Sequence, residues 1–499
     1  MFLDYVYDPN EKYQPCNDIL SYLQKTGISI FSHDTNVEKA IRNVFGKKMP
    51  DTPMALVPFY SVYDNKEVFL PIDLCLCSTG SNGMCAGNTY KEAFLQGVCE
   101  IFERYSILNI FFKNICPPSI PINYFAGTEA ERMYRILVSA GFKIRIMDCS
   151  LGKGLPVIGA IIVNGSNNSY NIKFGADFVP HIALERCLTE AFQSSTGFNG
   201  LSSTSIWIDE CFEFDMDCRY ENFNKIVKNS SGVWPSSIFG DIPSYEFRPY
   251  PETYGTSDTN DVLIANELIG NLGYKMYIRD NTASDIPALY IFIPGMSGTY
   301  VDAEHFMYNN KMYFSEEFAM LDNIDSLDED AMKTLLEGLK NMPLSNLSKI
   351  ELGQFAKYDS SSDMKTMDIR QLLFMLSYRT GDTKTAISLL QVLCNEKSSA
   401  KTYYAIAAKY IALRNQGHSN TKIKSILETI YSSSIINEVI DDFTNQKDTF
   451  KNYMLSKRIQ DMTDEEIKGL LKVIEVYMKL NKSFSSMGRR QYKLKELFV

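Results

Sequence analysis

Hydrophobic and polar positions follow two different patterns along the chain. From about Met54 to about Ser326, short apolar runs of strand type alternate with longer stretches of helical period. The runs MALVPFYSVYD and KEVFLPIDLCLC are rich in valine, leucine and aromatic residues, and Asp64-Asn65 between them predicts a hairpin-like turn. Further strands are predicted at FKIRIMD, LPVIGAIIVN, YNIKFGAD, YKMYIRDN and PALYIFIPGM.

Helical period predicts helices from about Thr89 to Asn114, from about Thr128 to Ala140, from about Pro180 to Ser195 and at DVLIANELIGNLG. Residues 201–260 are polar and interrupted by prolines, so we expect irregular structure there. Beyond about Ser326 only helical segments remain, joined by short turns. They suggest helical pairs stacked like tetratricopeptide repeats, although no strict repeat consensus is present.

The change of pattern predicts an α+β fold in three parts. Residues 1–50 are expected to form a short helical lead, with NDILSYLQKTG as an amphipathic turn or two. Residues 51–325 are expected to form an α+β domain, and residues 326–499 an all-helical, repeat-like domain. A chain of 499 residues is long enough for several domains, so this division agrees with its length.

Composition and charge exclude several classes of protein. The N-terminal sequence MFLDYVYDPNEKYQ lacks the basic region of a signal peptide, and no run approaches the roughly 18 apolar residues of a membrane span. The formal charge of −10 disfavours nucleic-acid binding and suits a small ligand or a basic peptide partner. Eleven cysteines without a C-x-x-C pair argue against a zinc ribbon and a disulfide framework, so we expect a cytoplasmic protein.

The segment SNGMCAGNTYKEAFLQGVCEIFERYS, residues 81–106, carries the candidate chemistry. Glu92, Gln96, Glu100 and Glu103 are spaced by four, four and three residues, so they share one face of a helix. Apolar residues occupy much of the remaining surface, and the helix is therefore expected to be largely buried. Unpaired carboxylates on such a helix repel one another and are costly to desolvate. A magnesium ion, which prefers a few carboxylates together with phosphates and water, would remove that conflict.

Two structural explanations of this stripe are open. Thr89-x-x-Glu92 is a capping box, which accounts for Glu92 without any ligand. Glu100, Glu103 and Arg104 could equally form a solvated edge of the helix.

A second helix, HIALERCLTEAFQSS, places Arg186 and Glu190 four residues apart. The ordinary interpretation of that spacing is an intrahelical ion pair. Taken together, the two helices offer carboxylates for a metal and a guanidinium for phosphates. The chain has no Walker A loop, no kinase glycine-rich loop and no dinucleotide fingerprint.

The first of these segments resembles the long signature S-N-G-x-x-A-G-N-T-x-x-E-A-x-x-Q-G-x-x-E-x-x-E-R of the YcaO family. ALERCLTEAFQ is similar to the second helix of that family, A-x-E-R-x-x-T-E. SLGKGLPVIGAIIV, FGAD and IPGMSGTY resemble further blocks in the expected order, so the resemblance covers about residues 54–310. The helical tail is similar to the branch with a tetratricopeptide-like C-terminal domain.

The resemblance implies an α+β fold that binds ATP through carboxylate-bound Mg²⁺ rather than through a phosphate loop. It implies that magnesium is held by Glu100, Glu103 and Glu190. It assigns to the nucleotide Cys85, Asn88, Glu92, Arg104, Arg186 and Glu190. Cys85 stands where relatives often have a serine, and a thiol donates more weakly than a hydroxyl. No catalytic residue follows from the motifs.

The resemblance also implies ATP-dependent modification of a ribosomally made peptide. In such a reaction a nucleophile adds to a backbone amide, the amide oxygen takes the γ-phosphoryl group of ATP, and phosphate leaves. Azolines, thioamides or amidines result. The azoline-forming branch usually ends in a proline-rich tail, whereas this chain ends RQYKLKELFV, which favours another amide modification.

A second departure concerns the metal site. Family members normally carry an earlier helix, S-x-x-x-E-x-x-E-R, that adds two glutamates for magnesium. Between NDILSYLQKTG and MALVPFYSVYD this chain has only NVEKAIRNVFGKK, which lacks the pattern. Two explanations are open. A second chain in a homo- or hetero-oligomer supplies the helix, or the protein is a noncatalytic relative that acts as a scaffold or accessory factor in peptide or ribosomal-protein modification.

Overall fold

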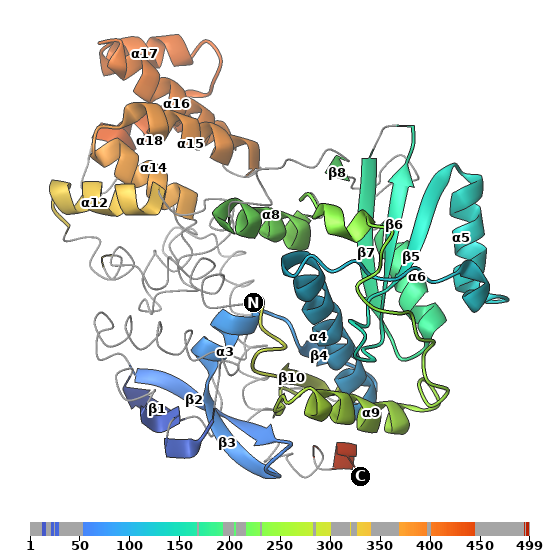
Figure 1. The fold of residues 1–499 in the computed structure, drawn as a ribbon. Coiled ribbons are helices and arrows are strands. Elements are labelled where there is room, and N and C mark those ends of the chain that lie inside the picture. The colour runs from blue at the N-terminus through green and yellow to red at the C-terminus, as the bar shows by residue number, and fades with distance from the viewer. Residues whose placement is uncertain are drawn as a thin grey trace. The chain divides into compact units, whose positions relative to one another are not determined.

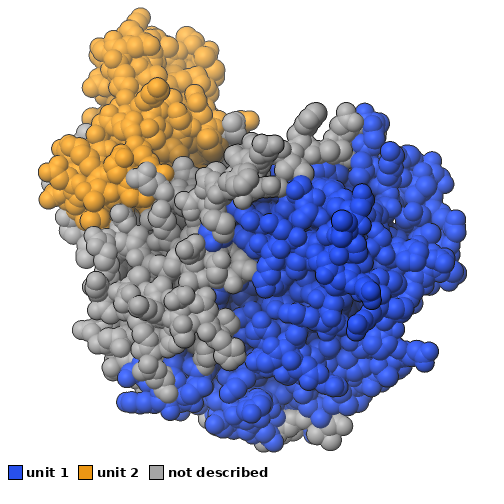
Figure 2. Space-filling model, viewed as in Figure 1, with its two compact units in different colours: residues 1–308, 475–499 blue, residues 309–474 orange. Residues whose placement is uncertain are grey.

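The computed structural model describes residues 12–15, 21–23, 25–28, 53–166, 169–192, 204–205, 216–229, 232–282, 286–300, 320, 327–340, 369–396, 401–444, 494 and 496–498. The chain divides into two compact units (Figure 2). Unit 1 comprises residues 1–308 and 475–499, and unit 2 comprises residues 309–474. The predicted boundary at residue 325, like NVEKAIRNVFGKK, lies outside the described residues.

Sheet A of unit 1 has the strand order β1-β2-β9-β10-β4, with β3 on β2, and every pairing is antiparallel. Its strands are β1 Lys12–Pro15, β2 Pro53–Ser61, β3 Lys66–Pro71, β4 Met84–Ala86, β9 Tyr277–Asp280 and β10 Ala288–Phe292. The predicted hairpin is confirmed, because β2 and β3 pair from Ser61↔Lys66 to Leu56↔Pro71. Asn65 in the turn takes a positive φ of 49°, which asparagine tolerates better than most residues.

Two predictions near the start of the chain are wrong. The second apolar run does not continue as a strand, since Ile72–Thr79 forms helix α3 directly after β3. A short, continuous apolar run has no period that separates a buried strand from a buried helix. Residues 12–15, which fall within the predicted helical lead, form strand β1.

Sheet B is an antiparallel meander, β5-β6-β7-β8. Its strands are β5 Phe142–Asp148, β6 Val157–Asn164, β7 Ser169–Ala176 and β8 Thr204–Ser205. The three predicted strands in this region are confirmed. β8 pairs only with Ser169 and Tyr170, so within the described residues no strand pairs with the outer edge of β7 beyond Tyr170.

The helices of unit 1 are α3, α4 Tyr90–Phe112, α5 Glu129–Ser139, α6 Pro180–Glu190, α8 Met216–Asn229 and α9 Asp258–Asn271, with 3₁₀ turns η2 Ile122–Phe125, η4 Ser236–Phe239 and η9 Glu496–Phe498. The predicted helices at α4, α5, α6 and α9 are confirmed. Helix α8 contradicts the expectation of irregular structure over residues 201–260. Its polar composition concealed a helical spacing of buried apolar residues, Tyr220, Phe223 and Ile226.

Helix α4 lies between the two sheets (Figure 1). It packs on β4 and β10 of sheet A and on β6 and β7 of sheet B. Alternate residues of β6 face opposite ways, with Ile161 in the core around α4 and Ile162 in the core under α5 and α6. The ring of Phe94 meets that of Phe498 at 5.5 Å, so η9 packs on unit 1, although the sequence pattern assigns it to the helical part.

The C-terminus of α4 is satisfied by a buried arginine from α8. One terminal nitrogen of Arg219 donates to the carbonyl oxygens of Phe111 at 2.7 Å and Phe112 at 3.1 Å, and to the side chain of Asn114 at 2.8 Å. The last carbonyls of a helix have no intrahelical partner and carry partial negative charge. Arg219 therefore fixes the end of the helix that crosses the core.

We predict that Arg219→Met lowers the free energy of unfolding by about 2 kcal/mol, because it leaves buried carbonyl groups without a donor. Urea unfolding checks this value. The matched control is Lys113→Met, which removes an exposed cation from the same helix end and is expected to cost about 0.5 kcal/mol. Equal losses in the two variants would contradict the capping role of Arg219.

Unit 2 is helical in its described residues. Its helices are α12 Glu329–Lys340, α14 Ile369–Arg379, α15 Thr383–Glu396, α16 Lys401–Asn415, α17 Asn420–Leu427 and α18 Ser433–Thr444. The helical segments expected beyond about Ser326 are confirmed within the described residues. Consecutive helices α14, α15 and α16 pack on one another, and their apolar faces share one core. Their likeness to tetratricopeptide repeats stays a prediction. Among the described residues, no helix of either unit is long and apolar enough to cross a membrane.

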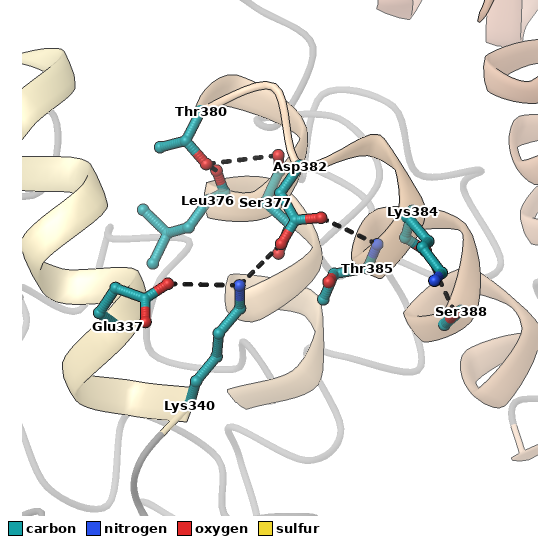
Figure 3. A network of polar contacts seen from close by, with 9 residues as sticks. All are labelled: Glu337, Lys340, Leu376, Ser377, Thr380, Asp382, Lys384, Thr385 and Ser388. Carbon is teal, nitrogen blue, oxygen red and sulfur yellow. Dashed lines mark hydrogen bonds and ion pairs between the residues drawn. The ribbon is translucent and has the colours of Figure 1, made fainter.

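A polar network joins α12 to the turn before α15 (Figure 3). The ammonium of Lys340 lies 2.7 Å from the carboxylate of Asp382 and 3.5 Å from that of Glu337. The same aspartate accepts a hydrogen bond from the backbone N–H of Thr385 at 3.2 Å, as an N-cap does. The side chain of Asp382 thus caps the N-terminus of α15 and also forms an ion pair with α12.

Asp442 on α18 is a buried carboxyl group in the same unit, 8% exposed, and the hydroxyl of Tyr403 donates to it at 3.0 Å. Burial raises its pKa to about 6, opposed by that hydrogen bond. The folded state therefore binds a proton more tightly than the unfolded chain. Unit 2 should gain stability as pH falls from above 6 toward the ordinary value of 3.8.

We predict that Asp442→Asn flattens this pH dependence and stabilises unit 2 at pH 8 by about 1 to 3 kcal/mol, because the amide needs no desolvated charge. Hydrogen exchange of α16 and α18, corrected for intrinsic rates, measures the change. Asp330→Asn, on an exposed aspartate of α12 in the same unit, is the control. A pH dependence that survives Asp442→Asn would rule out this carboxyl as its source.

Candidate functional site

Glycines bring the segment around β4 into close contact with β10 and with α4. Gly83 has a φ of +87°, and a Cβ there would lie 2.2 Å from the carbonyl oxygen of Ile291. A Cβ on Gly97, within α4, would lie 2.6 Å from the sulfur of Cys85. Because only glycine fits either position, the signature segment can fold back as strand β4 onto its own helix.

The capping box predicted at the start of α4 is present. The hydroxyl of Thr89 accepts the backbone N–H of Glu92 at 3.0 Å. The carboxylate of Glu92 accepts the backbone and side-chain N–H groups of Asn88 at 2.9 and 3.1 Å. The structure thus brings together two predicted nucleotide-binding residues, Asn88 and Glu92, and gives Glu92 a structural task of its own. Their contact with a nucleotide stays a prediction.

Cys85 points into the packing between β4 and α4. Its thiol donates to the carbonyl oxygen of Leu289 at 3.6 Å. Burial raises the pKa of the thiol to about 12, with the hydrogen bond to Leu289 opposing the shift. The group is therefore a neutral thiol at pH 7 and is unsuited to act as a thiolate nucleophile.

Two turns further along α4, Glu100 is half-buried and Glu103 is 8% exposed. Burial raises the pKa of Glu103 to about 7, against the attraction of Arg104, and the charge of Glu190 adds to the rise. Burial also raises the pKa of Glu100. Glu103 is thus not part of a solvated edge.

Helix α6 brings its own charges to these carboxylates. A Cβ on Gly175 of β7 would lie 2.4 Å from the carbonyl oxygen of Ala183 and 3.0 Å from the Cβ of Arg186, so glycine lets α6 rest directly on the strand. One terminal nitrogen of Arg186 donates to the side chain of Gln96 on α4 at 3.3 Å. The two candidate helices therefore meet, as the motifs predict.

The site holds polar groups without partners. Nε of Arg186 is buried and has no hydrogen-bond partner in the structure. Within the described residues, no hydrogen bond or ion pair within 4.0 Å engages Glu100, Glu103 or Glu190. The intrahelical pair between Arg186 and Glu190 is therefore not formed. Buried charges left in this state are costly, and an anionic nucleotide with its cation would relieve the cost.

Sequence reasoning missed two charged residues, Lys173 of β7 and Asp177 directly after that strand. Burial lowers the pKa of Lys173. The positive charge of Arg104 lowers it further, and the negative charges of Glu190 and Glu103 oppose the shift. Burial raises the pKa of Asp177, whose carboxylate accepts the N–H of Val179 at 2.8 Å. The available signal was a charged residue inside the otherwise apolar strand pattern YNIKFGAD.

The charge of Glu190 contributes to the raised pKa of both Glu100 and Glu103, so the three predicted metal ligands lie near one another. The part of the chain that the structure describes contains no group of three or more histidine, cysteine, aspartate or glutamate side chains arranged to hold a metal ion. The assignment of magnesium to these glutamates stays a prediction. The carboxylates and the guanidinium without partners have the chemistry and charge that a magnesium ion with a bound nucleotide would require.

Comparison with known proteins identifies relatives of this chain. An uncharacterized protein of Haemophilus influenzae is 25% identical over 499 residues, covering 96% of this chain and 82% of its own length. The ribosomal protein S12 methylthiotransferase accessory factor YcaO of Escherichia coli is 28% identical over 334 residues, covering 66% of this chain. The match spans only 56% of that relative's length.

Solved structures of similar proteins include a heterocyclase in complex with substrate and cofactor, with a TM-score of 0.41 and 16% identity over 58% of this chain and 41% of its own. They also include YcaO from Methanopyrus kandleri bound with AMPPCP and Mg²⁺, with a TM-score of 0.35 and 20% identity over 52% of this chain and 67% of its own.

The profile of the YcaO cyclodehydratase family, described as binding ATP and Mg²⁺, matches residues 16–297. That range is more than half of the chain, and it includes both candidate helices, sheet B and every strand of sheet A except β1. The predicted α+β fold is confirmed, and the protein belongs to the YcaO family.

Proposed function

We propose that this protein is an ATP-dependent enzyme, or the subunit of one, that activates a backbone amide of a ribosomally made peptide by O-phosphorylation. Membership of a family described as binding ATP and Mg²⁺ supports the proposal that this protein binds ATP. The observation that carries the proposal is the set of charges between α4 and α6 that lack partners, Glu100, Glu103, Glu190 and the Nε of Arg186.

Each helix has a separate task in this proposal. The carboxylates of Glu100, Glu103 and Glu190 hold magnesium, which supplies charge neutralisation at the transferring phosphoryl group. Arg104 and Arg186 attract the phosphate oxygens, and Asn88 lies toward the nucleotide beside Glu92. Glu103 is buried and the other charged groups on the two helices are half-buried, and this partial loss of solvent strengthens these attractions. A nucleophile adds to the amide carbon, the former amide oxygen takes the γ-phosphoryl group of ATP, and ADP is released. The oxygen then leaves as phosphate, and an azoline, thioamide or amidine forms, according to the nucleophile.

We further propose that another polypeptide chain completes the metal site. The S-x-x-x-E-x-x-E-R pattern is absent from residues 1–53, and the carboxylates assigned to magnesium come from α4 and α6 alone. Magnesium is usually bound by carboxylates together with phosphates and waters. Carboxylates from a second chain could therefore join those of α4 and α6 in one metal site. The test is whether ATP turnover by the purified chain rises when products of neighbouring genes are co-expressed with it. Turnover that no neighbour changes would contradict this part.

We predict that the double variant Glu100→Gln/Glu103→Gln lowers ATP turnover by about 100-fold or more, because the metal loses its charged ligands. A phosphate-release assay measures it. The matched control, Glu246→Gln/Glu267→Gln, removes two exposed glutamates of the same unit. Without nucleotide, Glu103→Gln is expected to stabilise the protein by about 1 to 3 kcal/mol, since an unpartnered buried charge is removed. Unchanged turnover in the double variant would exclude the proposed site.

We predict that two substitutions of Glu92 separate capping from nucleotide binding. Glu92→Gln keeps an acceptor for the capping box and should leave stability within about 0.5 kcal/mol, whereas Glu92→Ala should lose about 1 kcal/mol. If Glu92 also serves the nucleotide, Glu92→Gln weakens Mg–ATP binding in calorimetry.

The control for this experiment is Glu131→Gln on α5, which has the same capping box. There the carboxylate of Glu131 accepts the N–H of Gly127 at 2.7 Å, and Thr128 caps the helix. Equal Mg–ATP affinity in Glu92→Gln, Glu131→Gln and the wild type would confine Glu92 to capping.

A second candidate function is an accessory role in the modification of a ribosomal protein. The observation that favours it is the similarity to the Escherichia coli accessory factor. In this role the chain acts as a noncatalytic scaffold. Tight Mg–ATP binding and turnover would argue against a scaffold, and a pull-down without any ribosomal component would count against the accessory role.

A further inference from the structure

We propose that Lys173 binds the phosphate end of the nucleotide, beside the carboxylates assigned to magnesium. This inference rests on the proposed function and adds to that site a cation carried by the sheet rather than by either helix. Lys173 belongs to none of the motifs that identify the family.

The position of Lys173 follows from the register of sheet B. It lies opposite Ala160 of β6, and no strand among the described residues pairs with the other side of β7 at this point. Helices α4 and α6 both pack on β7, and they meet one another through the contact of Arg186 with Gln96. Lys173 is two residues from Gly175, so both positions face the same way, toward α6.

The charges around Lys173 come from both helices. Glu190 of α6 and Glu103 of α4 each attract its ammonium group, and Arg104 repels it. The side chain is half-buried in a strand whose flanking residues, Ile172 and Phe174, are buried apolar ones. A lysine in such a place requires negative charge nearby to offset its desolvation.

The neighbours of Lys173 indicate which part of a nucleotide it would meet. Magnesium held by these carboxylates would neutralise charge on the phosphates of ATP, so a cation beside the metal ligands would face the phosphates rather than the adenosine. Lysine binds phosphate as a compact point charge and needs no planar geometry. The buried Nε of Arg186, on the helix that faces the same part of β7, offers a second donor for the same anion.

The experiment compares binding of Mg–ATP, Mg–ADP and AMP by calorimetry, using whichever form binds Mg–ATP, the chain alone or with its co-purified partner. Lys173→Met is expected to weaken Mg–ATP and Mg–ADP by about 10- to 100-fold, the usual size of a charged hydrogen bond, and to leave AMP unchanged. Lys173→Arg should restore most of the loss. The control, Lys143→Met, removes an exposed lysine from β5 of the same sheet.

The outcomes separate this inference from the proposed function. If the wild type binds Mg–ATP and Lys173→Met binds it equally well, the role of Lys173 is overturned and the proposed site stands. Equal weakening of ATP and AMP would also overturn it, because it would indicate a structural role. If no form of the wild type binds Mg–ATP, the proposed function fails and this inference fails with it. Should Lys173→Met not fold, the comparison of Lys173→Gln with Lys173→Arg decides.

Discussion

The burial of α4 between two sheets is the constraint on which the site depends. Apolar residues of the helix are covered by sheet A on one side and by sheet B on the other, so its carboxylates are left in the narrow zone where α6 and the edge of β7 approach. Glu103 is consequently almost removed from water. A protein selected only for stability would have an apolar residue or an ion pair there, because replacement of a buried charge by a well-packed apolar group is often neutral or favourable. Retention of an unpartnered carboxylate is therefore easier to explain by binding than by folding.

Close packing through glycine determines how near the charged groups come. Gly97 admits β4 against α4, and Gly175 admits α6 against β7. A methyl group at either position would overlap backbone or sulfur atoms and force the elements apart by a substantial fraction of an ångström or more. Electrostatic attraction in a poorly solvated site falls with separation, so the strength of the charge cluster depends on the contact at Gly175, which holds Arg186 of α6 against β7.

Sequence reasoning located the elements whose signals are local and failed where tertiary context decides. Thr128 and Glu131 on α5, like the matching residues on α4, are a capping box that can be read from four letters, and both helices are present. The run IDLCLC has no period and became a helix, and the polar α8 was missed altogether. Lys173 could not be found in this way, because a strand period says which face a residue occupies but not which helix covers that face. Its neighbours on α4 and α6 are brought to it only by the three-dimensional fold.

The ends of α4 also limit how a phosphate could be bound. Helix N-termini commonly bind anions through free backbone N–H groups. Here the backbone N–H of Glu92 already donates to Thr89, so that donor is not available to a phosphate. The carboxylate of Glu92 accepts the N–H of Asn88 and places a negative charge at the same helix end. At the other end Arg219 neutralises the carbonyl groups. The dipole of α4 is thus largely compensated within the protein. Phosphate binding near its middle would have to rely on side-chain cations and a metal ion, which agrees with a chain that has carboxylates and guanidinium groups on facing helices and no phosphate loop.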